Sequence, residues 1–198
     1  MDDSRAKKQS LRLQALARRD AMSEEARIEG SFAVADRLAA LLVFEPGTIV
    51  SGFLPIRSEV DPRPLMVALA DRGARLCVPA IVDGQLQFRQ LLRGAPLEPQ
   101  GFGTYAPGSD AAVLDPEIML VPLAAFDRRL HRIGYGRGYY DRAIEALRAK
   151  SIEPHLCGVA FAVQEVERVP NEDHDIGLDC IATEVGLLDL RRPKGASA

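Results

Sequence analysis

Apolar and polar positions follow a helical spacing in the first part of the chain. Residues 5–20 form a basic helical pattern in which Lys8, Arg12 and Arg19 recur at steps of four and seven, so these side chains share one face. By itself, such a pattern is more typical of a solvated helix face than of a binding site. Ser23 is placed to cap a second helix, whose apolar positions are Phe32, Val34, Leu38 and Leu41.

Short apolar runs further along the chain predict buried strands, because they are rich in β-forming residues and too short for helices. These runs cover residues 48–53, 118–122, 155–161 and 180–183. Asp61 and Pro62 mark the start of a helix that Gly73 ends, and another helix is expected from about 140 to 150. Strands and helices therefore alternate, as they do in α/β proteins.

One hairpin interrupts this alternation. Residues 75–81 and 85–91 flank Asp83-Gly84, which is a strong signal for a two-residue β-turn. The stretch 92–110 is rich in glycine and proline and is predicted to be a long loop of the kind that closes over a substrate.

These elements predict an α/β fold: a three-layer, mostly parallel Rossmann-like sheet with helices on both faces and an antiparallel hairpin arm. The chain has 198 residues, of which 47% are hydrophobic, and this is enough for one good core. We therefore expect a single domain over residues 1–190 and a polar C-terminal tail over residues 191–198.

The charge balance argues against a nucleic-acid surface, since 25 basic and 28 acidic residues give a net charge of −3. The first twenty residues are highly charged and no apolar run reaches about eighteen residues, so neither a signal peptide nor a membrane span is expected. Cytoplasm is the predicted compartment.

Cysteine and histidine residues give no clear site in the sequence. Cys77, Cys157 and Cys180 are odd in number and scattered in apolar surroundings, which favours buried reduced thiols over disulfides or a metal cluster. The three histidines lie far apart, without the spacing typical of zinc ligands or a paired nucleophile: His131, His155 and His174.

The segment 132–142 carries the strongest chemical signal. Its alternate glycines let backbone N–H groups approach a polyanion, close to the start of a helix: Gly134, Gly136 and Gly138. Arg132 and Arg137 can neutralise phosphate oxygens, and Asp141 can hold a divalent cation. The dinucleotide and Walker patterns both fail here, and a plain tight loop would have no use for both charge signs. Phosphoryl transfer is therefore the predicted chemistry.

Several blocks together resemble the 5-formyltetrahydrofolate cyclo-ligases, also called methenyltetrahydrofolate synthetases. The matching blocks, in the family's order, are residues 8–12, 53–61, 121–127 with 132–142, 158–161 and 171–179. Two places depart from the family pattern. Leu130 stands where many members carry glycine, and residues 101–107 follow the pattern only loosely, so no ligand role is carried onto them.

The resemblance implies a ligase that converts 5-formyltetrahydrofolate and ATP to 5,10-methenyltetrahydrofolate, ADP and phosphate, through a phosphorylated formyl intermediate and with Mg²⁺. It also implies a fold like that of sugar-phosphate isomerases and CoA-transferases. The partners are then folate and ATP, without nucleic acid or membrane, and a monomer is expected.

Site residues follow from the same resemblance. It implies catalytic roles for Lys8, Arg132 and Arg137. It implies nucleotide contacts for Lys8, Gln9, Ser10, Leu11, Arg12, Arg132, Ile133, Gly134, Tyr135, Gly136, Arg137, Gly138, Tyr139 and Tyr140. It implies folate contacts for Leu54, Glu59, Tyr135, Gly136, Arg137, Gly138 and Tyr139. The implied metal ligands are Asp141 and Asp175.

Alternatives remain open at this point. Asp127 belongs to a matched block, but capping of backbone N–H groups is slightly favoured for it over a metal role. The whole chain could also be a sugar-phosphate isomerase or CoA-transferase-like enzyme, or a non-catalytic module that binds nucleotide or folate.

Overall fold

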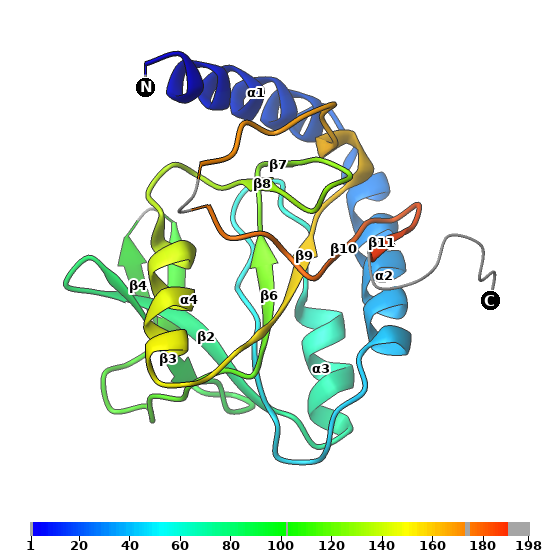
Figure 1. Cartoon of the computed structure of the whole chain (residues 1–198). Helices are drawn as coiled ribbons and strands as arrows, with labels where there is room; N and C mark the ends of the chain where they lie inside the picture. The colour runs from blue at the N-terminus through cyan, green and yellow to red at the C-terminus, as the bar shows by residue number, and fades with distance from the viewer. Residues whose placement is uncertain (1, 102, 173–174, 190–198) are drawn as a thin grey trace.

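The computed structural model describes residues 2–101, 103–172 and 175–189 (Figure 1). Within these residues, seven strands form one sheet in the order β11-β10-β9-β6-β1-β2-β3. Their bounds are β1 Ile49–Ser51, β2 Arg75–Val82, β3 Gln85–Gln90, β6 Ile118–Pro122, β9 His155–Val159, β10 Cys180–Ala182 and β11 Leu187–Asp189. The predicted tail at 191–198 lies outside the described residues.

The sheet is parallel in its centre and antiparallel at both edges. Strands β1, β2, β6, β9 and β10 run parallel, whereas β3 pairs antiparallel with β2 and β11 pairs antiparallel with β10. Asp83 and Gly84 have φ values of 49° and 73° in the β2–β3 turn, as a tight hairpin with right-handed strand twist requires. The predicted α/β fold with a hairpin arm is therefore confirmed.

Helices cover both faces of the sheet, which makes three layers (Figure 1). Alternate residues of β6 point to opposite faces, so Leu120 packs in the core beneath α2 and α3, while Val121 packs in the core beneath α4. The helices α1, α2, α3 and α4 span Asp2–Asp20, Glu24–Leu41, Arg63–Asp71 and Tyr139–Ala149. Helix α1 lies outside these layers and contacts the short strand β7 (Ala125–Phe126) and the 3-10 helix η1 (Ala162–Gln164).

Local signals place the helix starts well. Ser23 caps α2 by accepting a hydrogen bond of 3.1 Å from the backbone N–H of Ala26. Helix α3 begins at Arg63 with Pro62 as its N-cap, one residue later than expected. Asp61 precedes the cap and accepts a hydrogen bond of 2.9 Å from the N–H of Arg63. None of the helices in the described ranges is long and apolar enough to cross a membrane.

Two expectations of the sequence are wrong. The apolar pattern predicts Phe32 on the buried face of α2, but it is 55% exposed, because the buried face runs through Gly30, Ser31, Val34, Ala35 and Leu38. The stretch 92–110 is not a plain loop, since it contains an antiparallel hairpin of β4 (Leu97–Gly101) and β5 (Thr104–Pro107). Proline and glycine inside β4 conceal this strand, and a two-stranded ribbon tolerates them because its outer edge is unpaired.

Candidate active site

The candidate site lies where the chain leaves the carboxyl ends of the parallel strands. Helix α1, the loop after β1, the segment between β8 (Arg132–Ile133) and α4, and the loop before β10 all contribute side chains. Two cavities, of about 310 and 910 Å³, adjoin there. They share Arg132, Gly134, Gly138 and Asp141.

The glycine-rich segment brings main chain to the boundary between the cavities. Gly138 precedes α4 in a left-handed conformation, with φ 61°, and Gly136 has φ 91°. A Cβ atom at Gly136 would also lie only 3.4 Å from the guanidinium of Arg12. Both positions therefore favour glycine on conformational grounds, and Gly138, the residue before α4, lines both cavities.

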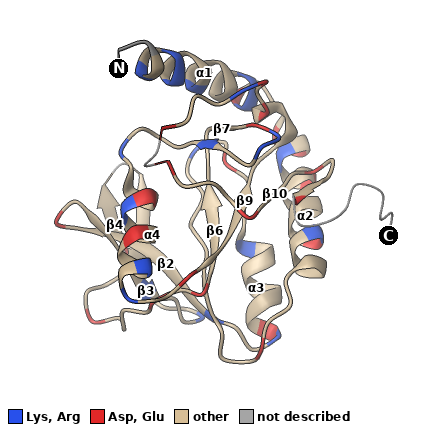
Figure 2. Ribbon diagram, viewed as in Figure 1, with Lys and Arg blue, Asp and Glu red and all other residues tan. Residues whose placement is uncertain are grey.

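The larger cavity is lined mainly by charged groups. Its basic side comes from α1, on which Lys and Arg recur along the helix (Figure 2), and includes Lys8 and Arg12. Arg12 Nε donates to the carbonyl of Gly134 at 2.8 Å, which fixes α1 against the glycine-rich segment. Burial lowers the pKa of Arg12, but a guanidinium remains charged at neutral pH.

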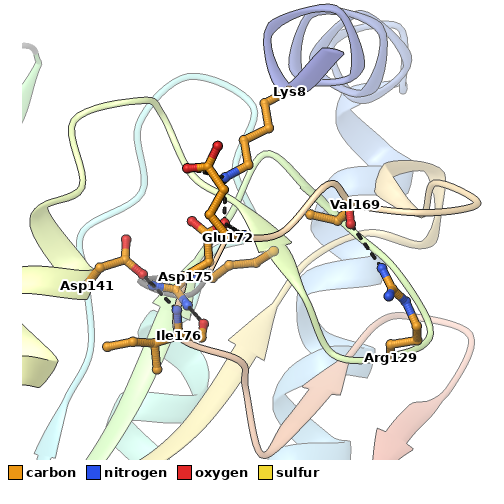
Figure 3. Close-up of polar contacts among 8 residues, drawn as sticks. Lys8, Arg129, Asp141, Val169, Glu172, Asp175 and Ile176 are labelled. Carbon is orange, nitrogen blue, oxygen red and sulfur yellow. Dashed lines mark hydrogen bonds and ion pairs between the residues drawn. The ribbon is translucent and has the colours of Figure 1, made fainter. Parts of the chain in front are cut away.

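Three carboxylates of the larger cavity are engaged with cations. Lys8 Nζ lies 2.5 Å from Asp175 Oδ2 and 4.0 Å from Glu172 Oε2, and Figure 3 shows Lys8 reaching down from α1 toward both acids. Asp141 Oδ1 accepts a 2.7 Å hydrogen bond from Arg132 and one of 3.4 Å from the N–H of Ile176. The loop before β10 is thus held between α1 and α4.

These carboxylates suit a magnesium ion. Asp141 and Asp175 line the same cavity, and Mg²⁺ prefers carboxylate and phosphate oxygens together with water. Arg132 is almost fully buried, with 5% of its side chain exposed, and it also donates to the carbonyl of Ile176. It therefore holds Asp141, and four other cationic side chains line the same cavity: Arg5, Lys8, Arg12 and Arg142.

The smaller cavity is mostly apolar, and its two carboxylates are Glu59 and the shared Asp141. Its apolar wall is formed by Phe53, Leu54, Ile81, Leu86, Tyr139 and Tyr140. Glu59 accepts hydrogen bonds from the hydroxyl of Tyr135 and, at 2.9 Å, from the N–H of Ile56. Burial raises the pKa of Glu59 above its usual value, although these donors and nearby arginines oppose the shift. Such a pocket accepts a flat ring whose N–H groups can donate to the carboxylate.

Sequence reasoning missed one residue that supports this pocket. Arg19 is only 1% exposed and donates to Ser58 Oγ at 3.0 Å and to the hydroxyl of Tyr135 at 2.8 Å. Tyr135 is 38% exposed overall, yet its hydroxyl lies between Arg19 and Glu59. Burial and the Glu59 carboxylate raise the pKa of Tyr135, although Arg19 opposes the shift. The seven-residue step from Arg12 to Arg19 is the sequence signal that places both side chains on one face of the helix.

Most of the implied site residues come together at the two cavities, but not all of them. Gln9, Ile133 and Gly136 line the larger cavity, and Leu54, Arg137 and Tyr140 line the smaller one. Ser10 and Leu11 line neither cavity. The hydroxyl of Ser10 accepts a hydrogen bond of 3.2 Å from Gln14, and Leu11 packs against the small core cluster that contains Ile133. Residues of the cavities that were not anticipated include Arg5, Thr104, Tyr105, Arg142, Glu145 and Glu172.

Asp127 has the geometry of a structural residue. It is fully buried and accepts hydrogen bonds from the N–H groups of Arg129 and Val169, both at 2.9 Å, and of His131 at 3.3 Å. Burial alone would raise its pKa, but these donors lower it below the usual value. They hold the turn in which Leu130 has a φ of 65°, so the position that many relatives fill with glycine is indeed left-handed.

Comparison with known proteins identifies the family. A family model described as the 5-formyltetrahydrofolate cyclo-ligase family matches residues 4–184. The chain belongs to this family. It is 28% identical over 173 residues to the 5-formyltetrahydrofolate cyclo-ligase of Escherichia coli K12, covering 84% of this chain and 94% of that protein. It is 27% identical over 202 residues to that of Mycolicibacterium smegmatis, covering 93% and 97%.

Solved structures agree with this assignment. The NMR structure of 5,10-methenyltetrahydrofolate synthetase from Aquifex aeolicus has a TM-score of 0.77 and 30% identity, and the match covers 96% of each chain. A 5,10-methenyltetrahydrofolate synthetase from Mycoplasma pneumoniae has a TM-score of 0.72 at 22% identity, over 89% of this chain and 98% of that one, which supports the fold.

Proposed function

We propose that this cyclo-ligase chain converts 5-formyltetrahydrofolate to 5,10-methenyltetrahydrofolate with ATP as co-substrate, releasing ADP and phosphate. The observation that carries the proposal is the pair of adjoining cavities, one charged and one apolar, with the segment from Arg132 to Asp141 at their boundary. A triphosphate in the charged cavity would meet a pterin in the apolar cavity at the glycine-rich segment.

The reaction follows from the poor leaving ability of a formamide oxygen. Transfer of the γ-phosphoryl group to that oxygen releases ADP and gives an iminium phosphate. The neighbouring nitrogen then attacks the activated carbon, closing a five-membered ring, and inorganic phosphate leaves. The protein has to align the formyl oxygen with the γ-phosphorus, neutralise charge and exclude water.

Specific roles follow for the cationic groups. Lys8 and Arg12 contact the phosphates, with Lys8 nearest the transferred group, and Arg137 approaches from the folate side. Arg132 holds Asp141 in place. Lys8 must release Asp175 for this purpose, and a bound Mg²⁺ would take that carboxylate over and, with Asp141, neutralise the phosphates directly or through water.

The folate roles rest on the smaller cavity. Glu59 accepts hydrogen bonds from the pterin ring, and Leu54 packs against its face. Tyr135 keeps the Glu59 carboxylate oriented, while Tyr139 lines the border with the nucleotide. An ionised Glu59 matches a ring that presents N–H donors.

The decisive experiment is a continuous assay with ATP, Mg²⁺ and 5-formyltetrahydrofolate, following the near-ultraviolet absorbance of the methenyl product. Lys8→Ala should reduce turnover by about 100-fold, because charge stabilisation at the phosphates is lost. Lys7→Ala is the matched control, since Lys7 is exposed and lines neither cavity. Wild-type kinetics for Lys8→Ala would remove α1 from the nucleotide site.

A second variant tests the proposed metal ligands. Asp141→Asn should lower turnover by about 10- to 100-fold and raise the Mg²⁺ concentration needed for half-maximal rate. Thermal melting of this variant shows whether loss of the negative charge that pairs with Arg132 has also affected folding. An unchanged Mg²⁺ requirement would exclude Asp141 from metal binding.

Three further predictions belong to this proposal. We expect a monomer, a single domain over residues 1–190 and a cytoplasmic location. Sedimentation analysis, limited proteolysis and localisation of the tagged protein test them one by one.

A further inference from the structure

A second group of metal-binding side chains lies at the opposite end of the sheet. His155 and Cys180 are the first residues of β9 and β10, and parallel strands begin at the edge away from the candidate active site. Cys157 lies directly opposite Cys180 in the strand pairing, and His155, two residues earlier, points to the same face. One nitrogen and two sulfur atoms of these residues all lie within 4.8 Å of one another.

The prediction of buried free thiols is confirmed, but residues that are scattered in the sequence are not scattered in space. The sequence suggested unrelated buried thiols and an isolated histidine, whereas strand register brings all three together. Cys157 and Cys180 are 0% and 1% exposed, and the side chain of His155 is 32% exposed. The thiols are enclosed by the core, whereas the partly exposed imidazole connects them to solvent, from which an ion can enter.

The spacing suits a tetrahedral ion. Bond lengths of about 2.3 Å to sulfur and about 2.0 Å to nitrogen place neighbouring ligand atoms about 3.5–3.8 Å apart around tetrahedral zinc. The present separations, at most 4.8 Å, differ from that by about 1 Å, which side-chain rotation can supply. No movement of the strands is required.

The surroundings favour binding of a cation as well. Asp179 Oδ2 lies 3.3 Å from His155 Nδ1, and a carboxylate beside an imidazole is a common arrangement around metal-binding histidines. Asp189 is opposite Cys180 in β11 and adds a second negative charge.

We propose that His155, Cys157 and Cys180 form a binding site for a thiophilic divalent ion such as Zn²⁺. The ion links β9 to β10 and leaves a fourth position for water or a carboxylate. Because these ligands are far from the cavities that hold folate and nucleotide, the role is structural: bound Zn²⁺ stabilises the folded chain without entering the reaction.

Cobalt substitution tests the proposal directly. The full chain, reduced with a phosphine and freed of metal, is titrated with Co²⁺ in the presence of saturating Mg²⁺, which occupies carboxylate sites. Thiolate-to-cobalt charge transfer should give a near-ultraviolet band that saturates at one ion per chain, and added Zn²⁺ should remove it. Absence of the band overturns the proposal.

Matched variants locate the ion. Cys157→Ser and Cys180→Ser should each weaken or abolish the band, and His155→Ala should change it without disturbing the core, since this side chain is partly exposed. Cys77→Ser is the control, because Cys77 is buried in the other core cluster and burial raises the pKa of its thiol to about 12. A band that survives in both Cys157→Ser and Cys180→Ser, or that Cys77→Ser removes, contradicts the assignment.

Thermal melting gives a readout that does not depend on colour. Zn²⁺ should raise the Tm of the wild-type chain and of Cys77→Ser, because an ion that binds only the folded state stabilises it by mass action. The rise should be smaller in His155→Ala, which keeps two of the three ligands. An equal Zn²⁺-induced rise in His155→Ala would show that the ion binds elsewhere.

Discussion

Replacement of Arg19 by methionine is the sharpest test of how the folate cavity is built. Arg19 is buried at the end of α1, and its guanidinium holds both Ser58, by a 3.0 Å bond, and the hydroxyl of Tyr135, by a 2.8 Å bond. Tyr135 in turn donates to Glu59. Methionine retains much of the side-chain volume but removes both hydrogen bonds and the charge.

The expected magnitude follows from these two bonds. A hydrogen bond to a charged group contributes about 1.5–3 kcal/mol. Of the two bonds, only the one to Tyr135 is connected, through Glu59, to the proposed folate contact. Its loss should therefore raise the KM for 5-formyltetrahydrofolate by about 10- to 100-fold, at 1.4 kcal/mol for each factor of ten. The loss of the bond to Ser58 should appear as lower stability and not as weaker folate binding.

The assay compares KM for folate and for ATP in Arg19→Met and in the control Arg18→Met. Arg18 is exposed on the same helix and donates to the carbonyls of Val163 and Glu165, so it shares the charge of Arg19 but not its contacts. We expect the KM for ATP to be unchanged in both variants. A folate KM equal to that of wild type in a folded Arg19→Met would refute the reasoning, since Tyr135 and Glu59 would then need no support.

Three further changes test single features of the fold and the site. The kcat/KM for folate should fall as pH drops through the raised pKa of Glu59, because protonation removes an acceptor, and Glu59→Gln should lack this acid limb. The pKa of Asp127 is lowered in the folded state, so its contribution to stability is present above the usual aspartate pKa and is lost as pH falls through the folded value. Asp127→Asn should lower the Tm at neutral pH by about 4–8 °C, for a loss of about 2 kcal/mol, and flatten the acid dependence of melting. Leu130→Gly relieves about 1–2 kcal/mol of left-handed strain but removes a buried side chain worth about 2–5 kcal/mol, so urea unfolding should show a net loss of stability, and a gain would contradict this balance.

The architecture was predictable because its signals are local. The apolar run at 118–122 is β6 residue for residue, and the positive φ values at Asp83 and Gly84 are those that this dipeptide adopts in a hairpin. Strand β4 was missed for the opposite reason. Its proline and glycine lower the local strand signal, and only pairing with β5 makes the strand form.

The candidate site was predictable where a motif is continuous in sequence. Residues 132–142 reach the boundary of both cavities, as their glycines and charges suggested. The hydrogen bond from Arg19 to the hydroxyl of Tyr135 was not predictable in this way. The two residues are far apart in sequence, and they meet only because α1 packs against the rest of the chain. A helical step of seven shows that Arg19 shares a face with Arg12, but not that the end of this face is buried.

Strand register explains the remaining gap between sequence and structure. Cys157 and Cys180 belong to different strands, and their side chains meet only because β10 adds in parallel to β9 with these two residues aligned. A shift of one residue would turn Cys180 to the opposite face of the sheet and separate the thiols. Cysteine spacing in the sequence does not predict that alignment. The apolar pattern of both strands does fix it, because Leu156 and Ile181 must remain in the core beneath α4. The burial that fixes the sheet therefore also assembles the His155, Cys157 and Cys180 site.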